Sequence, residues 1–151
     1  VYGCPSVRKG ILQMPDGSFT LSPATAEKTE NIRVNEANEI DGWTDETAAL
    51  CWKLTADERG IYDVHMTVNG RYGVDPMEAD VALDTNGDTL HARAQHDEDI
   101  DPLLARYHRG MVSHIGTICL SQGQNTISLR LDAPVPQDMF RFTGIKLYRR
   151  G

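Results

Sequence analysis

Apolar and polar residues alternate one by one along much of this 151-residue sequence. In the segment 61–68 the even-numbered positions are apolar, and polar residues occupy most of the odd-numbered positions. The apolar residues are Tyr62, Val64, Met66 and Val68. Successive side chains of a β-strand point to opposite faces, so this period of two predicts strands with one buried and one solvated face. The pattern recurs at 79–83, 90–94, 118–120, 127–131 and 140–147.

Turn residues separate these segments. Asn86-Gly87, between two alternating runs, is the strongest short-range hairpin signal, and the PDG in segment 11–21 and the SQGQN at 121–125 also predict turns. Sustained helical period is rare. Only 99–107 (DIDPLLARY) predicts one or two helical turns, with Asp101 as N-cap and Pro102 at the first helical position.

Short strands joined by turns predict an all-β fold, a two-sheet antiparallel β-sandwich. No Pro/Ser-rich linker and no repeat divides the sequence, so we expect a single domain over residues 1–151. The expected core consists of the inward-facing members of the strands: Trp52, Leu54, Tyr62, Val64, Met66, Val81, Leu83, Ile118, Ile127, Leu129, Phe142 and Ile145.

Charge and composition exclude several classes of partner. The net charge of −7 disfavours nucleic acid and anionic membrane surfaces. No apolar run approaches the roughly 20 residues that a membrane-spanning helix needs. The first residues lack a signal-peptide pattern, and the start at Val1 suggests a piece excised from a longer protein.

The three cysteines, Cys4, Cys51 and Cys119, lack the CxxC spacing of a zinc knuckle. Their odd number allows at most one disulfide within the chain. Cys51 and Cys119 fall in predicted strands, where a thiol is usually a small buried apolar group. We therefore predict no bridge between these two.

Motifs for catalysis are missing: the sequence has no phosphate-binding glycine loop, no HExxH and no G-x-S-x-G. The acidic run HDEDID at 96–101 predicts a solvated loop, with a calcium site as the alternative. A glycoside hydrolase would need two acids roughly 5–9.5 Å apart, and no such pair is assignable. We therefore expect no enzyme.

Histidines are scattered. His65 and His91 fall on polar strand faces, which predicts solvated side chains. A metal centre built from His91, His108 and His114 stays open as an alternative.

Three aromatic residues, Trp43, Tyr72 and Tyr107, fall in predicted loops instead of strands. Arginine and histidine neighbours flank the two tyrosines. An exposed ring can stack on the apolar face of a pyranose while polar neighbours take its hydroxyls. For Trp43 two interpretations are open: a stacking platform for sugar, or a packing residue that closes one end of the sandwich.

The order of several motifs resembles a family of jelly-roll domains, the carbohydrate-binding-module-like domains of secreted fucosidases, sulfatases and related bacterial polysaccharide-degrading enzymes. It is similar to the family-six and family-thirty-five carbohydrate-binding modules. The resemblance begins near Phe19 and ends near Arg149, so it does not cover residues 1–18. Its motifs are DGWT at 41–44, the W-x-L of 52–54, GIYDV at 60–64, and IGTICLSQGQNTISL at 115–129.

This resemblance implies a non-catalytic jelly roll that binds a poly- or oligosaccharide without a cofactor. The implied setting is secreted, periplasmic or at a bacterial cell surface, beside a catalytic domain of the same parent chain. The alternative is an accessory domain that packs against that neighbour without binding sugar. The position that often carries a calcium ligand in such modules falls on Ala24, with Glu27 three residues on.

The candidate residues are therefore as follows. For sugar binding at a loop end of the sandwich they are Trp43, Arg71, Tyr72, Arg93, Tyr107, His108 and Arg109. The arginines suit a carboxylate or sulfate on the sugar. For a calcium ion they are Glu27, Asp97, Asp99 and Asp101.

Overall fold

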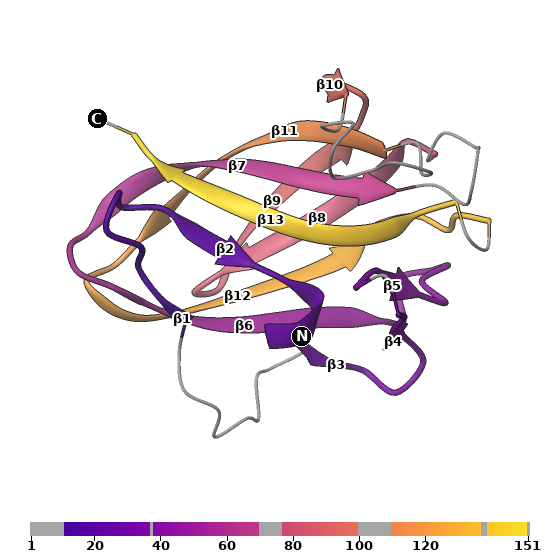
Figure 1. The fold of residues 1–151 in the computed structure, drawn as a ribbon, viewed down its shortest axis with the longest axis horizontal. Coiled ribbons are helices and arrows are strands. Elements are labelled where there is room, and N and C mark those ends of the chain that lie inside the picture. The colour runs from indigo at the N-terminus through magenta and orange to yellow at the C-terminus, as the bar shows by residue number, and fades with distance from the viewer. Residues whose placement is uncertain (1–10, 37, 70–76, 100–109, 137–138, 151) are drawn as a thin grey trace.

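The structure, a computed structural model, describes residues 11–36, 38–69, 77–99, 110–136 and 139–150, and these form a β-sandwich (Figure 1). In the six-stranded sheet the order is β1 (Ile11–Leu12), β6 (Ala49–Ala56), β12 (Gly123–Leu131), β8 (Ala79–Thr85) and β9 (Asp88–Ala94), with β3 (Glu27–Lys28) also on β6. In the five-stranded sheet it is β10 (Glu98–Asp99), β11 (Gly110–Leu120), β7 (Gly60–Asn69), β13 (Arg141–Arg149) and β2 (Phe19–Leu21).

A separate hairpin, β4 (Arg33–Val34) with β5 (Ile40–Asp41), lies at one end of the sandwich (Figure 1). The predicted all-β sandwich is confirmed. One pairing differs from the expected antiparallel pattern, because β1 pairs with β6 in parallel. The described residues contain a single 3-10 turn, η1 (Pro23–Thr25), and no helix long and apolar enough to cross a membrane.

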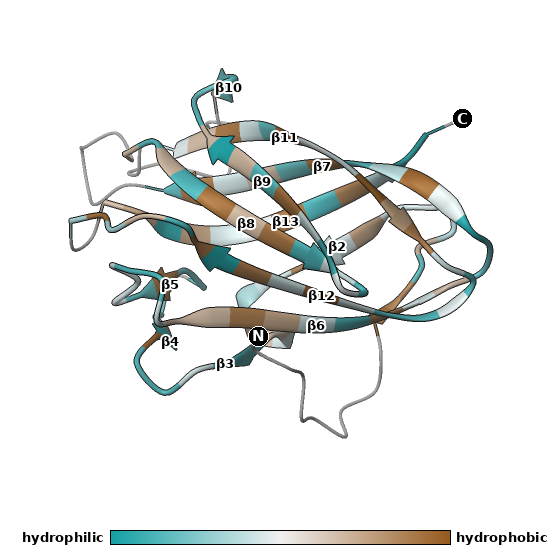
Figure 2. Ribbon diagram, turned by 180° about the vertical axis from the view of Figure 1, so that it is seen from behind, coloured by the Kyte–Doolittle hydropathy of each residue, from teal (hydrophilic) through white to brown (hydrophobic). Residues whose placement is uncertain are grey.

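The core lies between the two sheets, as the alternation predicted. Every residue of the predicted core is buried, from Leu54 and Tyr62 at 0% exposed to Ile118 at 7%. Apolar and polar bands alternate along the strands in Figure 2. Along β7 buried residues alternate with less buried ones, whereas residues 49–52 of β6 are all buried.

The predicted turns are also present. Asn86 and Gly87 both have positive φ, 51° and 94°, as a type I′ hairpin turn requires. The helical turn predicted at 99–107 begins as strand instead, since Glu98–Asp99 form β10. Residues 100–107 lie outside the described part of the chain.

The two strand cysteines are not bonded to each other, as predicted. Cys51 is fully buried and belongs to a disulfide, whereas Cys119 is a free, exposed thiol. The reason given for the prediction was therefore wrong for both residues: Cys119 lies on the solvent side of its strand, and Cys51 is not a thiol. Cys4 lies outside the described residues.

Candidate functional site

A groove crosses the solvent face of the five-stranded sheet, with a volume of about 710 Å³. Its walls combine outward residues of β2, β7, β11 and β13 with two core residues, Leu21 and Ile145. We call it the sheet groove. Its described lining is Thr20, Leu21, Ser22, Asn38, His65, Thr67, Asn69, Glu98, Val112, Thr143, Gly144, Ile145, Lys146 and Tyr148.

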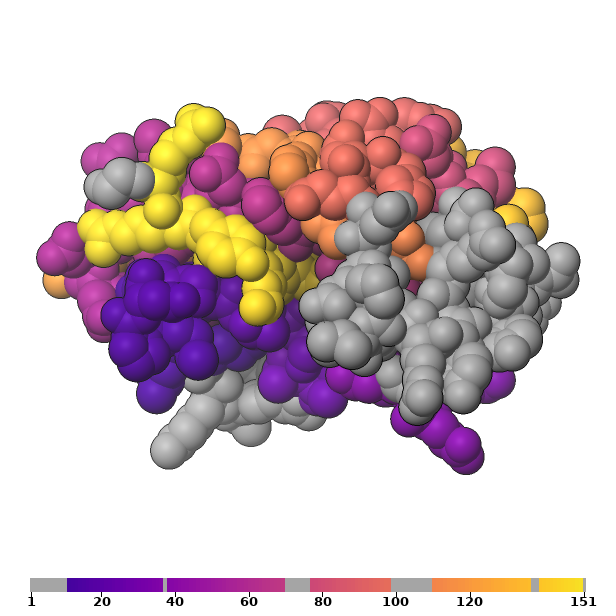
Figure 3. Space-filling model, turned by 45° about the horizontal axis from the view of Figure 1, so that its top comes forward, coloured from indigo at the N-terminus to yellow at the C-terminus, as the bar shows by residue number. Residues whose placement is uncertain are grey.

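Figure 3 looks onto the molecule from above and shows residues of β2 (indigo), β7 (magenta) and β13 (yellow) next to one another. The pairing registers agree, since Lys146 of β13 lies opposite both Thr20 of β2 and His65 of β7. The groove floor is therefore built from three neighbouring strands. Such a floor is held by backbone hydrogen bonds, so its side chains have fixed spacing.

Aromatic rings line one part of this groove. His65 of β7 and His114 of β11 lie directly opposite in the register, and their rings stack in parallel with centroids 4.1 Å apart. The ring of Tyr148 contacts His65 at 4.9 Å and is 40% exposed. Glu98 of β10 bonds to Nε2 of His114. The tyrosine thus offers a ring face to solvent beside hydrogen-bonding groups.

The surroundings of His65 favour its neutral form. Partial burial lowers the pKa of His65, and the positive charge that His114 can carry lowers it further. Glu98 and Asp63 act in the opposite direction. Neutral imidazole has both a donor and an acceptor nitrogen. At pH 7 the His65 ring can therefore donate a hydrogen bond to a hydroxyl group or accept one from it.

A buried carboxylate fixes one end of the groove. Glu39 is 1% exposed and accepts hydrogen bonds from Asn35 (3.1 Å) and Asn69 (2.7 Å), and Arg141 lies 3.6 Å from it. These contacts join the β4–β5 hairpin to the ends of β7 and β13. Asn69 lines the groove, and its buried Oδ1 has no hydrogen-bond partner in the described part of the chain. That oxygen can accept a hydrogen bond.

Trp43 is a packing residue, and the stacking role considered for it is wrong in this structure. Its side chain is 2% exposed and makes edge contacts with Phe140 and Phe142, at 6.0 and 6.1 Å between centroids. Gly42, with φ +82° and a backbone oxygen 3.3 Å from where a Cβ would stand, turns the chain here. The indole therefore closes one end of the core and offers no face to a ligand.

Arg93 lies away from the sheet groove. It belongs to β9 of the six-stranded sheet and pairs with Asp80 at 2.9 Å. Five other predicted sugar-binding residues, Arg71, Tyr72, Tyr107, His108 and Arg109, lie outside the described residues and stay predictions. Asn69 at the end of β7 pairs with Gly110 at the start of β11.

The predicted calcium ligands do not come together. Glu27 lies in β3 of one sheet, and Asp97 precedes β10 on the opposite side of the sandwich (Figure 1). Asp97 accepts the backbone N–H of His114 at 2.8 Å. Asp99 is in β10, and Asp101 lies outside the described residues. One ion cannot be held by both Glu27 and the acidic run.

The histidine trio considered from the sequence is also wrong. His91 is on β9 and bonds to Asp132 at 2.8 Å on the outer face of the six-stranded sheet, so it does not approach His114. His108 lies outside the described residues. The histidine that does accompany His114 is His65.

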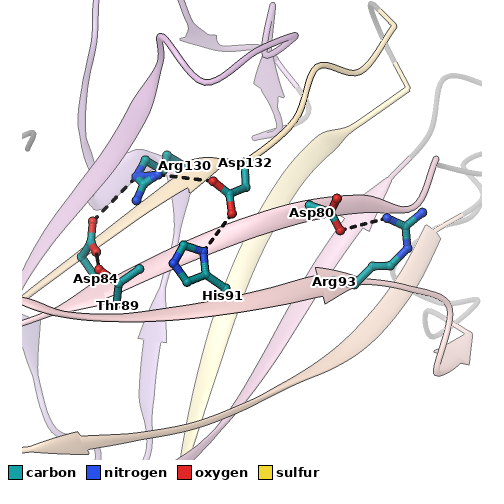
Figure 4. Close-up of polar contacts among 7 residues, drawn as sticks. All are labelled: Asp80, Asp84, Thr89, His91, Arg93, Arg130 and Asp132. Carbon is teal, nitrogen blue, oxygen red and sulfur yellow. Dashed lines mark hydrogen bonds and ion pairs between the residues drawn. The ribbon is translucent and has the colours of Figure 1, made fainter.

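The outer face of the six-stranded sheet carries a polar network (Figure 4). Arg130 lies between Asp84 (3.9 Å) and Asp132 (3.6 Å), and Asp84 also accepts the hydroxyl of Thr89. The two carboxylates share one guanidinium. The guanidinium of Arg130 therefore offsets part of the negative charge of these two carboxylates.

Tyr148, Lys146 and His65 were missed as site residues because each falls on the polar parity of a strand, where solvated side chains are the usual occupants. The available signal was cross-strand: an aromatic, a cation and a histidine share the outward parity of β7 and β13. These three residues are neighbours because of the order of the strands in the sheet, which cannot be read from a single sequence.

Comparisons with known proteins support the fold. No family model matches the sequence, and no curated protein matches it. Solved structures do. A family 35 carbohydrate-binding module from Clostridium thermocellum aligns with a TM-score of 0.59 and 11% identity, over 88% of this chain and 98% of that one.

Two larger enzymes contain the same fold. A GH26-CBM35 β-(1,4)-mannanase from Podospora anserina matches over 90% of this chain with a TM-score of 0.62 and 15% identity. An α-L-fucosidase from Vibrio sp. strain EJY3 matches over 93% with a TM-score of 0.65 and 9% identity. This chain spans 28% of the mannanase and 24% of the fucosidase. The resemblance to carbohydrate-binding-module folds expected from the motifs is confirmed.

Proposed function

We propose that this chain is a non-catalytic carbohydrate-binding domain and that the sheet groove binds the sugar. The observation that carries the proposal is the groove itself: an exposed Tyr148 ring, with His65 beside it and Lys146 also on the lining, on a fold shared with carbohydrate-binding modules. A pyranose ring can stack on the tyrosine. Its hydroxyls then find donors and acceptors on Thr67 and Asn69.

The ligand is a poly- or oligosaccharide. A groove that lies across a sheet suits an extended chain of sugars, and Lys146 suits a hydroxyl or a carboxylate at one position. With one exposed ring as platform, the dissociation constant should lie roughly between micromolar and millimolar.

The setting is an accessory domain of a larger secreted protein that acts on polysaccharide. Support comes from the mannanase and the fucosidase, in which this fold makes up about a quarter of the chain. Glycans of this kind are found outside the cell, so a surface or periplasmic location agrees with the binding role.

The test is affinity electrophoresis and calorimetry on a panel of neutral, uronic and sulfated polysaccharides. Tyr148→Ala and Lys146→Ala should weaken binding of the best ligand. For Tyr148 the loss should be about fivefold, since an aromatic contact is worth roughly 1 kcal/mol. Arg93→Ala is the matched control, because that cation lies on the other sheet, and it should bind like the wild type.

Two outcomes would contradict the proposal. If no polysaccharide binds, the domain has the accessory role instead, and its exposed apolar residues, Leu12 at 72% and Ile61 at 50%, become candidates for contact with a neighbouring domain. If Tyr148→Ala binds normally while Tyr72→Ala does not, the sugar site lies at the loop end and not in the sheet groove. Release of reducing sugar by the wild type would overturn the non-catalytic role.

A further inference from the structure

The side chains of His65, His114 and Glu98 form a cluster at the sheet groove, whose lining includes His65 and Glu98. Their ligand atoms, one from each residue, all lie within 4.8 Å of one another. Three different strands of one sheet supply them: β7, β11 and β10. We propose that this cluster is a binding site for a late divalent transition-metal ion such as Zn²⁺ or Cu²⁺.

The backbone places these groups firmly. His65 and His114 are paired directly across β7 and β11, and Glu98 pairs through Val112 two residues before His114. A bulge between His114 and Gly116 shifts the register just after this point, and His114 is exposed on the outer side while Ile115 is buried. The site therefore rests on the sheet and does not depend on a loop.

The donor set favours late transition metals over calcium or magnesium. Two imidazole nitrogens and one carboxylate oxygen suit Zn²⁺ and Cu²⁺, whereas Ca²⁺ and Mg²⁺ prefer oxygen ligands alone. Donors about 2.1 Å from a tetrahedral ion are about 3.4 Å apart. Because the lone pair of an imidazole nitrogen lies in the ring plane, the two parallel rings must rotate out of their stack until both planes meet at the ion. The side chains of His114 and Glu98 are 48% and 56% exposed, which gives them room to do so.

The local charge also favours a cation. Asp97 bonds to the backbone of His114, and Asp63 lies close enough to influence His65, so these two carboxylates add to Glu98. Among the described residues, the cations nearby are Lys146, opposite His65 in the register, and Arg150, 3.5 Å from Asp63. Within this described set the acidic groups outnumber the basic ones. Three protein ligands would leave at least one position of the ion open to water or another oxygen.

The experiment is calorimetric titration of the tag-free protein with ZnCl2 and with CuSO4, without sugar, and with CaCl2 for comparison. Zinc and copper should bind with a stoichiometry of one at the strongest site, and calcium should not compete. His114→Ala and His65→Ala should each weaken zinc binding at least about tenfold, a free-energy change of roughly 1.4 kcal/mol. His91→Ala, whose imidazole lies on the other sheet beside Asp132, should bind like the wild type.

A second measurement reads the ligands directly. The electron paramagnetic resonance spectrum of the copper complex should show coupling to two imidazole nitrogens in the wild type and in His91→Ala, and to one in His114→Ala. Circular dichroism checks that each variant is folded. The proposal is overturned if neither ion binds, if calcium displaces zinc, or if the double variant His65→Ala/His114→Ala binds zinc as tightly as the wild type. Because no sugar is present, failure here leaves the carbohydrate proposal standing.

Discussion

Trp43 shows how a single residue can look like a binding group in the sequence and be a core residue in the fold. Its neighbours are acidic and polar, yet two local features direct the indole inward. Gly42 adopts positive φ, and Asp45 accepts both the N–H (2.9 Å) and the hydroxyl (2.5 Å) of Thr47, which fixes the chain after the ring. The hydrogen bond from Thr47 is the main cause that lowers the pKa of Asp45.

Replacement of Trp43 should therefore affect stability and not sugar binding. Trp43→Ala should lower the free energy of unfolding by about 3–5 kcal/mol, because it leaves a large cavity between Phe140 and Phe142. Trp43→Phe should cost much less, since the indole Nε1 has no hydrogen-bond partner among the described residues to lose. Chemical denaturation measures both changes. Equal stability of wild type and Trp43→Ala would show that the ring is not in the core.

His65 makes a prediction about pH. Its pKa in the folded state is lowered from the ordinary 6.5, so the native state favours the neutral ring. A lowered histidine pKa gives stability that is fully present above 6.5 and is lost as the pH falls below that value. In metal-free buffer with EDTA, the wild type should therefore lose more stability between pH 7.5 and pH 5 than His65→Gln does.

The same pKa can be followed by NMR. His114→Gln removes the neighbouring charge that lowers the pKa, so the pKa of His65 should rise in that variant and stay below or near 6.5. A His65 pKa that is unchanged in His114→Gln would show that the stacked neighbour has no electrostatic effect on it.

At the scale of the element, the hairpin β8–β9 depends on its two turn residues. Both adopt positive φ, and Asn86 also bonds to β12 through Asn125 (2.7 Å) and the N–H of Thr126 (2.9 Å). The turn thus fixes the register of β8 with β9 and holds the hairpin to the next strand.

Gly87→Ala should lower the free energy of unfolding by about 1–2 kcal/mol, the usual cost of a left-handed conformation for a residue with a Cβ. No atom lies within 4 Å of the added Cβ, so the cost is conformational and not steric. Gly87→Asn is the matched control and should cost clearly less, because asparagine tolerates this conformation. Equal destabilisation by both variants, measured by denaturation, would contradict this account.

At the scale of the whole molecule, the two outer faces differ in what they offer a ligand. On one face, the guanidinium of Arg130 lies between the carboxylates of Asp84 and Asp132 (Figure 4). The opposite face leaves Tyr148 exposed and a groove open beside it. Tyr148 and the cluster of His65, His114 and Glu98 therefore lie on the same sheet.

The sequence by itself determined which residues are inside. Alternation with period two is a local property of the sequence. A strand with one apolar face is stable when that face packs away from water, and the predicted core residues between Trp52 and Ile145 are accordingly all buried. The turn at Asn86-Gly87 is equally local, because two successive positive φ angles select these residue types.

Only the tertiary structure decided which outward residues are neighbours. His65 and His114 are 49 positions apart in the numbering, and Tyr148 lies further still, yet the order β11-β7-β13 brings all three together. Strand order and register arise from the packing of the entire core, so no window of sequence contains them. For the same reason the exposure of Trp43 and the separation of Glu27 from the acidic run were not predictable from their neighbours in the chain.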